Sequence, residues 1–292
     1  MNKIILALAL TSFAFAGEIE WGHGTMELSG GAFGLKSSIS SDINTYSLVQ
    51  KHKNLLGTNL FYGYNLTIFD SETIKQLQSD YNSATKMANT IFSLANLNSK
   101  YKISEIKHRF KGLDLGVTLG YDILHKGERD YLGIGGYGGI SLPYIESSGS
   151  SKTTNIIKDI FKKSKTEFTT YKVGVGVFAQ KSLNNFISLY GSAIYAYQTG
   201  DIENDYIKLD STIDGAYLEL NAGLKFQAIK ADYDVGIVSI NPRLYGTIGW
   251  RYREWKVNNV SFGLNKTTLF NAPKPDMKFS SNVVTVGLGY SF

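Results

Sequence analysis

The chain has 292 residues and a formal net charge of +5, and it contains no cysteine. Without cysteine, neither a disulfide framework nor a thiolate metal site can form. Glycine (30 residues), tyrosine (19) and phenylalanine (16) are abundant whereas proline (4) is scarce, which favours strands over helices. The charge excess is too small to indicate nucleic acid as a partner, and no cofactor or metal motif is visible.

The first 16 residues have the layout of a secretory signal peptide. Lys3 supplies a short basic region and residues 4–10 an apolar one, and Ala14 and Ala16 are the small residues before a cleavage site at Gly17. Even when it is counted through Ala16, this apolar stretch of about 13 residues is shorter than the ~20 that a membrane-spanning helix needs. We therefore predict export, a mature chain that begins at Gly17, and a single domain over residues 17–292.

From residue 17 onward, apolar residues alternate with small or polar ones in a series of segments. The clearest are 56–68, 113–123, 216–226, 238–252 and 278–292, with weaker examples at 20–35, 43–51, 131–143, 171–180 and 186–198. Such alternation places apolar side chains on one face of a strand. The segments are long enough for tilted strands that cross a bilayer, which need about 9–11 residues. The sequence predicts a transmembrane, antiparallel, up-and-down β-barrel with its apolar face toward lipid.

The connections between these segments alternate in length. Tight turns are expected at 51–54, 125–130, 181–185 and 229–234, and longer connections at 70–109, 144–166, 199–213 and 254–277. Outer-membrane barrels have short periplasmic turns and long outer loops. This pattern predicts ten strands with both ends of the mature chain in the periplasm. Eight strands would remain if residues 17–54 formed no hairpin, and twelve is a further alternative.

One long connection has a helical pattern. Over residues 71–98 the apolar side chains recur at alternating spacings of three and four, at Ile74, Leu77, Tyr81, Ala84, Ala88, Ile91 and Ala95. This is the stripe of an amphipathic helix, and Ser71 would be its N-cap. We predict a helical insertion in an outer loop, which could pack on the barrel rim, cover the barrel mouth or bind a partner.

A second amphipathic segment lies at 152–165. Apolar residues stand here among lysines, including Lys158, Lys162, Lys163 and Lys165. A basic amphipathic segment suits an anionic membrane surface, and a solvated loop would have the same composition. Both interpretations stay open on the sequence.

Charged residues recur on the strand face opposite the apolar one. They are Asp114, Asp122, Lys172, Glu219, Lys225, Arg243, Arg251 and Arg253. If the apolar face meets lipid, these residues point into the lumen, which small barrels fill with side chains. Buried charges must be paired, so the sequence predicts an ion-paired, filled lumen. The arginine row from Arg243 to Arg253 leaves a second interpretation open, because arginine rings suit anion pores.

The chain ends on a strand-like segment with an aromatic last residue. One of its faces carries Val284, Val286, Leu288, Tyr290 and Phe292. This segment resembles the signal by which small, about ten-stranded outer-membrane barrels of Gram-negative bacteria are passed to their assembly machinery. The resemblance is to this class rather than to one family. It implies location in the outer membrane, with the assembly machinery, lipid and lipopolysaccharide as partners.

Two classes of function follow. The first is a surface-exposed structural or interaction protein with a largely filled lumen, whose loops could bind an extracellular partner. The second is a narrow, porin-like solute channel gated by the 71–98 helix. A hydrolase such as the omptin proteases is a distant third, because its histidine must lie beside a nucleophile or a carboxylate. The four histidines, His23, His52, His108 and His125, are scattered, so we expect no enzyme activity.

Overall fold

We analysed a computed structural model of the chain. The description covers residues 17–291 apart from 33–34, 54, 78–104, 125–129, 150–163, 205–209, 231–232, 236–237, 241–242, 265–266 and 273–275. The predicted signal peptide therefore lies outside the described residues, as does most of the segment 152–165, of which only Ser164 and Lys165 are described, at the start of a strand. Within the described part, no helix is long and apolar enough to cross a membrane.

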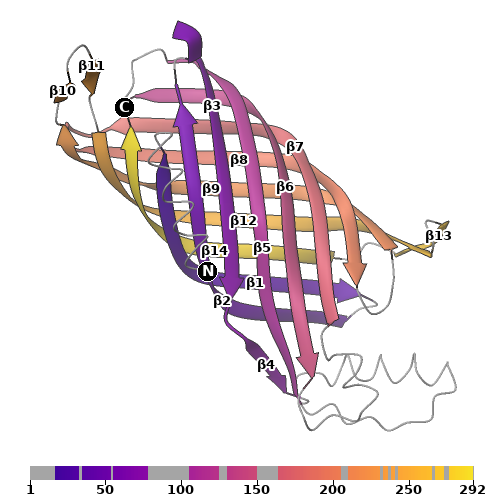
Figure 1. Cartoon of the computed structure of the whole chain (residues 1–292). Coiled ribbons are helices and arrows are strands. Elements are labelled where there is room, and N and C mark those ends of the chain that lie inside the picture. Colours follow the sequence, from indigo (N-terminus) through magenta and orange to yellow (C-terminus); the bar gives the residue numbers. More distant parts are fainter. Residues whose placement is uncertain are drawn as a thin grey trace, which may run out of the picture.

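Ten long antiparallel strands form one closed sheet (Figure 1). They are β1 (Glu18–Ala32), β2 (Leu35–His52), β3 (Leu60–Ser71), β5 (Glu105–Asp122), β6 (Tyr131–Gly149), β7 (Ser164–Ser182), β8 (Ile187–Asn204), β9 (Asp210–Lys230), β12 (Arg243–Leu264) and β14 (Asp276–Ser291). The sheet closes because β14 pairs with β1 and β12 pairs with both β9 and β14. Closure removes the unpaired edges that a bilayer would not tolerate. The predicted ten-stranded barrel, including the hairpin formed by β1 and β2, is confirmed.

The ladder register defines how the strands are staggered. A row of paired residues can be followed once around the barrel, through Ala179, Gly191, Ala222, Trp250, Val284, His23, Asn44, Asp70, Lys111, Tyr144 and Glu167. The row starts and ends on β7, but twelve residues apart. Such a stagger requires strands tilted by roughly 35–45° to the barrel axis, which is also the tilt of membrane-spanning strands.

The predicted helix is wrong at its start. Ile74–Leu77 form a short strand, β4, which pairs with Glu105–His108 of β5. The hydroxyl of Ser71 accepts a hydrogen bond from the Phe110 amide at 2.8 Å instead of capping a helix. The physical reason is that β5 runs beyond the end of β3, and its backbone groups there find partners in β4. Residues 78–98 of the predicted helix lie outside the described residues.

The connection between β9 and β12 is also longer than the predicted tight turn. It carries a small separate hairpin, β10 (Tyr233–Val235) with β11 (Val238–Ile240). Val238 and Ile240 therefore belong to this hairpin and not to the lipid face of the following barrel strand. The remaining short elements are a 3-10 turn, η1 (Leu55–Gly57), and β13 (Thr267–Ala272), which pairs with the far end of β12.

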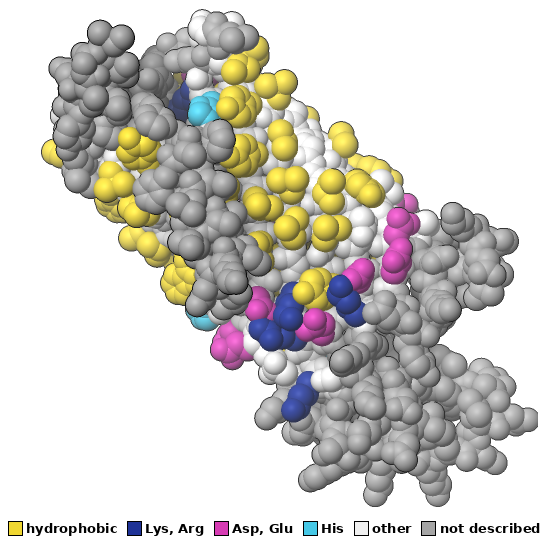
Figure 2. Space-filling view, in the orientation of Figure 1, with side chains coloured by type: hydrophobic (Ala, Val, Ile, Leu, Met, Phe, Trp, Pro, Cys, Tyr) yellow, Lys and Arg dark blue, Asp and Glu magenta, His cyan; other side chains and the backbone are white. Residues whose placement is uncertain are grey.

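The outer wall of the barrel is apolar (Figure 2). Outward side chains remain widely exposed along the strands, including Val173 (73%), Val175 (63%) and Leu119 (58%). A contiguous exposed apolar band of this kind indicates contact with lipid. Toward the end with the long connections, hereafter the long-loop end, the band gives way to outward ion pairs. Arg109 binds Asp70 at 2.6 Å, and Lys111 binds Glu146 at 2.9 Å.

The opposite end, hereafter the short-turn end, holds an anchored turn. The Asp130 carboxylate accepts hydrogen bonds from the Lys181 ammonium and from the Ser182 amide, the latter at 2.7 Å. The hydrogen bond from Lys181, followed by that from Ser182, lowers the pKa of Asp130 to about 2. A carboxylate with a depressed folded-state pKa stabilises above its unfolded pKa of about 3.9, and the contribution is lost as the pH falls toward 2.

We expect an NMR titration of the Asp130 carboxyl in the folded barrel to have its midpoint near 2. Lys181→Met removes the main donor and should return the midpoint toward the ordinary value. A midpoint near 4 in the unmodified protein would contradict this assignment.

Candidate functional site: the lumen

Along the barrel axis the inward side chains first line a cavity, then are charged, and then are aromatic. This order can be followed on single strands. On β12, Thr247 lines a cavity near the short-turn end, Arg253 is charged and buried, and Trp255 is aromatic and buried. On β7 the same order is Phe178, then Lys172, then Phe168. The lumen thus has three zones, which we name the turn-side cavity, the ion-pair layer and the aromatic plug.

The ion-pair layer contains three cations and three carboxylates: Lys172, Arg251, Arg253, Glu20, Asp114 and Glu219. All six are at most 3% exposed. Arg251 binds Glu20 at 2.5 Å, Arg253 binds Glu219 at 3.1 Å, and Lys172 donates to Asp114. Two longer contacts connect the pairs, Arg253 to Asp114 at 3.6 Å and Arg251 to Glu219 at 3.9 Å. Its formal charges cancel, as a buried network of charges requires.

Neutral side chains complete this network. The Tyr217 hydroxyl donates to Glu219 at 2.5 Å, and the Ser141 hydroxyl donates to Asp114 at 2.5 Å. Arg253 also donates to the Thr67 hydroxyl at 2.9 Å, and Arg251 to that of Ser47 at 3.1 Å. These hydroxyls bond with charged groups of the ion pairs, and the layer thereby links β1, β2, β3, β5, β6, β7, β9 and β12.

The aromatic plug fills the lumen on the long-loop side of the ion-pair layer. Its members are at most 5% exposed and comprise Met26, Ile43, Phe69, Phe110, Phe168, Ile213, Trp255, Val257 and Phe279. Phe168 and Phe279 meet edge to face at 4.9 Å between ring centroids. The Trp255 ring lies 5.6 Å from that of Tyr217, and its indole nitrogen donates to Ser141 at 3.0 Å. The plug is therefore packed directly on the ion-pair layer.

Glycines make room for the rings inside this narrow barrel. A Cβ atom at Gly116 or Gly139 would lie 2.8 or 2.9 Å from the Tyr137 side chain. Their role is to let a stacked pair of rings, Tyr137 and Tyr217 at 6.0 Å, fit against the wall.

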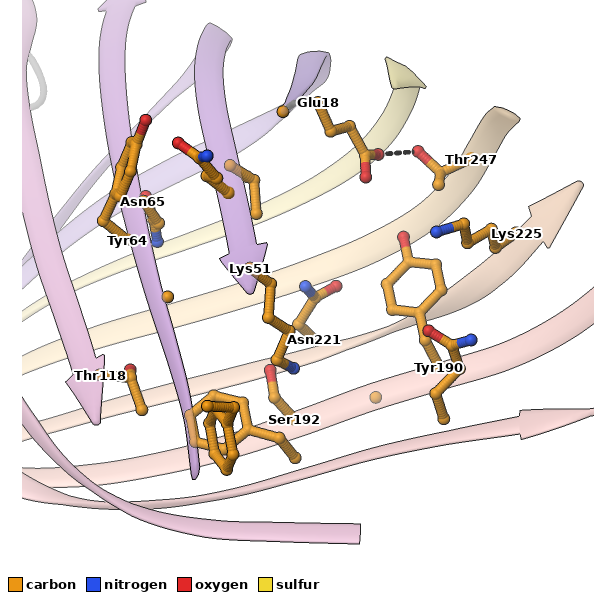
Figure 3. A pocket seen from close by; sticks show the side chains of 18 of the residues that line it. Glu18, Lys51, Tyr64, Asn65, Thr118, Tyr190, Ser192, Asn221, Lys225 and Thr247 are labelled. Carbon is orange, nitrogen blue, oxygen red and sulfur yellow. Dashed lines mark hydrogen bonds between the residues drawn. The ribbon is translucent and has the colours of Figure 1, made fainter. Parts of the chain in front are cut away.

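The turn-side cavity has a volume of about 420 Å³ and opens at the short-turn end. Figure 3 shows its polar lining, which includes Lys51, Lys225, Asn221, Tyr190 and Glu18. The floor of the cavity is the ion-pair layer, since Glu20, Glu219 and Arg251 line both. The cavity is thus closed on the side that faces the long-loop end.

The eight charged residues predicted for the lumen occupy different places. Asp114, Lys172, Glu219, Arg251 and Arg253 come together in the ion-pair layer. Lys225 lines the cavity, with its ammonium 3.5 Å from the Tyr245 ring. Asp122 lies at the short-turn end, where its carboxylate accepts hydrogen bonds from the backbone amides of Leu124 and Leu132. Arg243 is the first residue of β12, and its side chain lies outside the described residues.

Sequence reasoning missed one member of the ion-pair layer, Glu20. The alternation of apolar and polar residues is weak on its strand, because glycines stand at the inward positions 22 and 24 and polar residues at the outward positions 23 and 25. The signal that could have found it is Glu18 and Glu20 at the period of two that continues into the buried Met26.

The histidines and the terminal strand complete the predicted residues. His23 points outward and bonds with Asn44 at 3.2 Å, and His52 stacks on Tyr62 at 4.8 Å. His108 lies on β5, and His125 is outside the described residues. In the described part, no group of three or more histidine or carboxylate side chains could hold a metal ion. Val284, Val286 and Leu288 are 58%, 49% and 55% exposed, Tyr290 is half-buried and Phe292 is not described.

No family model and no curated protein match this chain. Solved structures of membrane barrels are similar in fold. They include the outer membrane protease OmpT of Escherichia coli, with a TM-score of 0.48, 11% identity and coverage of 95% of this chain and 97% of that chain. The translocator domain of the autotransporter NalP from Neisseria meningitidis has a TM-score of 0.37 and 11% identity, and the match covers 100% of this chain and 94% of that chain. Ail, the attachment invasion locus protein of Yersinia pestis, has a TM-score of 0.32 and 12% identity, and the match covers 95% of this chain and 100% of that chain. The similarity concerns the barrel architecture, so the function has to be derived from the residues of this chain.

Proposed function

We propose that the protein is an outer-membrane barrel with a closed lumen, which acts through its cell-surface side as a structural or interaction protein. The observation that carries this proposal is the ion-pair layer with the aromatic plug stacked on it. Together they fill the lumen with side chains at most 5% exposed. An aqueous pathway needs polar, solvated walls, and wide pores are found in barrels with more strands, 16–18 in porins.

The state of the arginines weighs against an anion channel. A selective arginine must offer its charge to a passing ion. Arg251 and Arg253 instead bind Glu20 and Glu219 at 2.5 and 3.1 Å and are at most 3% exposed. Carboxylates of the ion-pair layer neutralise their charges, and an entering anion would have to displace one of these carboxylates.

Features of the long-loop end support a role at the surface. The strands continue beyond the apolar band there, where outward pairs such as Arg109 with Asp70 replace lipid-facing side chains. With the short turns in the periplasm, this charged rim would meet the headgroups of the outer leaflet, including lipopolysaccharide. The proposed contact with an extracellular partner would then take place at this end of the barrel. The terminal strand would serve the assembly machinery, and the proposed role requires no catalytic centre.

Conductance tests the proposal. We expect the refolded barrel in a planar bilayer to give no stepwise current, whereas a general porin in the same bilayer serves as the positive control. Stable, ohmic current steps that depend on the amount of protein, from a sample shown to be folded by its heat-modifiable gel mobility, would overturn the closed-lumen proposal.

A loop variant separates the proposal from a gated pore. Leu77 pairs with Glu105, so a four-residue Gly/Ser turn can replace residues 78–104 and leave the β4–β5 pairing intact. We expect this variant to fold and to stay non-conducting, because the plug is built from strand residues. If the shortened barrel conducts while the full chain does not, the segment is a lid and the channel interpretation is correct.

A further inference from the structure

The turn-side cavity has the properties of a ligand site. We propose that it binds a small anion, a carboxylate or a phosphate group on a hydrogen-bonding body, from the short-turn end. The first observation is a contrast between cations. Each cation of the ion-pair layer has a carboxylate within 4 Å, whereas none of the carboxylates that the structure describes lies that close to the Lys51 ammonium. The fold thus pairs its deep cations with carboxylates, whereas the Lys51 amine at the cavity mouth has no described carboxylate within 4 Å.

The surroundings of Lys51 hold its charge in place without cancelling it. Its ammonium lies 4.4 Å from the Tyr131 ring centre and 4.7 Å from that of Phe178. Aromatic faces attract a cation through their quadrupole, but they carry no net charge. Lys51 is also exposed to solvent, so its donors remain reachable for an anion that enters the cavity.

Two further lysines reinforce the field at the mouth. Lys53 stacks on the same Tyr131 ring at 4.0 Å, and Lys225 reaches the cavity from another wall, on β9 (Figure 3). Both repel the Lys51 ammonium electrostatically, and a bound anion would relieve this repulsion. The lining also includes three carboxylates, of which Glu20 and Glu219 are bound by arginines of the ion-pair layer and Glu18 is not. Three lysines of the lining therefore face one carboxylate outside that layer, and an excess of positive charge in a cleft concentrates anions.

The deeper lining specifies what the anion is attached to. Asn65, Thr118, Ser192 and Asn221 present amide and hydroxyl groups to the cavity, and the side-chain oxygen of Asn221 has no hydrogen-bond partner among the described residues. Such groups bind hydroxyls. The volume of about 420 Å³ lies within the range of small-molecule sites, ~300–1,000 Å³. A hydroxy acid or a sugar phosphate has both required parts.

Equilibrium dialysis of the folded, detergent-solubilised full barrel tests the site. The probes are gluconate, glucose 6-phosphate and inorganic phosphate, with glucose as the neutral control. We expect saturable binding of at least one anion and none of glucose. Lys51→Met should weaken binding at least about tenfold, as expected for the loss of a charge-assisted contact, and Lys225→Met should weaken it less. Lys181→Met is the matched control, because Lys181 lies at the same end but does not line the cavity.

The binding results distinguish a carboxylate site, a phosphate site and the absence of a site. Gluconate binding without phosphate binding assigns a carboxylate site, and the reverse assigns a phosphate site. Absence of saturable binding by all three anions overturns the proposal, as does binding that Lys51→Met and Lys225→Met leave unchanged. If Lys51→Met fails to fold, two measurements still test the site: anion binding by Lys225→Met, and competition between chloride and the anion for the unmodified barrel. The test does not depend on conductance, so the site can fail while the closed-lumen function holds.

Discussion

Replacing Asp114 with leucine should destabilise the folded barrel by about 3–5 kcal/mol, the usual cost of removing one partner from a buried ion pair. Asp114 is 1% exposed and accepts hydrogen bonds from Lys172 and Ser141, and the Tyr217 hydroxyl oxygen lies 3.4 Å from its carboxylate. Its loss would leave the ammonium of Lys172 buried with no carboxylate within 4 Å among the described residues. The measurement is a urea unfolding titration in lipid vesicles, followed by tryptophan fluorescence.

The double variant Asp114→Leu/Lys172→Met is the matched control. It removes both charges of the pair and should recover a large part of the lost stability, because replacing a buried pair by apolar residues is often close to neutral. The two changes lie in one network and are therefore expected not to add. A double variant less stable than the single one would show that Lys172 is held by contacts other than Asp114.

Leu119→Arg should cost about 2–4 kcal/mol, since a charged side chain on the lipid face is least tolerated near the middle of the bilayer. Leu119 is 58% exposed on the outer wall, within the outward apolar run of β5. The same vesicle titration measures the effect. The loss should grow in lipids with longer acyl chains, because the arginine then has farther to reach to the headgroups.

Thr118→Arg is the control for this face assignment. Thr118 is 7% exposed and lines the turn-side cavity, so an arginine there projects into the lumen. Its cost should not depend on acyl-chain length. Equal dependence of both variants on chain length would mean that the two faces of β5 have been confused.

Much of the fold follows from local pattern. The period of two in side-chain direction is a property of any strand, and it suffices to place Val117 and Leu119 outside and Asp114 inside. Strand length and the alternation of short and long connections then give ten strands, because each strand crosses the bilayer once. These inferences need no knowledge of which residue meets which across the sheet.

The pattern fails where tertiary pairing competes with it. Residues 74–77 fit a helical stripe, but the free edge of β5 recruits them as β4. Val238 and Ile240 fit the alternation of the next strand, but they pair with β10 in a separate hairpin. In both cases a backbone hydrogen-bonding partner that is distant or unmarked in the sequence decides the structure.

The site itself depends on contacts that no local pattern contains. By itself the sequence determined the strands, their lipid face and a list of inward charges, and it predicts an export signal before Gly17. Only the tertiary structure decided that Arg251 meets Glu20, 231 residues away in the chain, and that Asp114 meets Lys172 from β7. It also decided that the charges form one layer, with aromatic rings on one side and, on the other, a cavity where no described carboxylate lies within 4 Å of Lys51. The reason is that the height of a side chain along the axis is fixed by the stagger of all ten strands together.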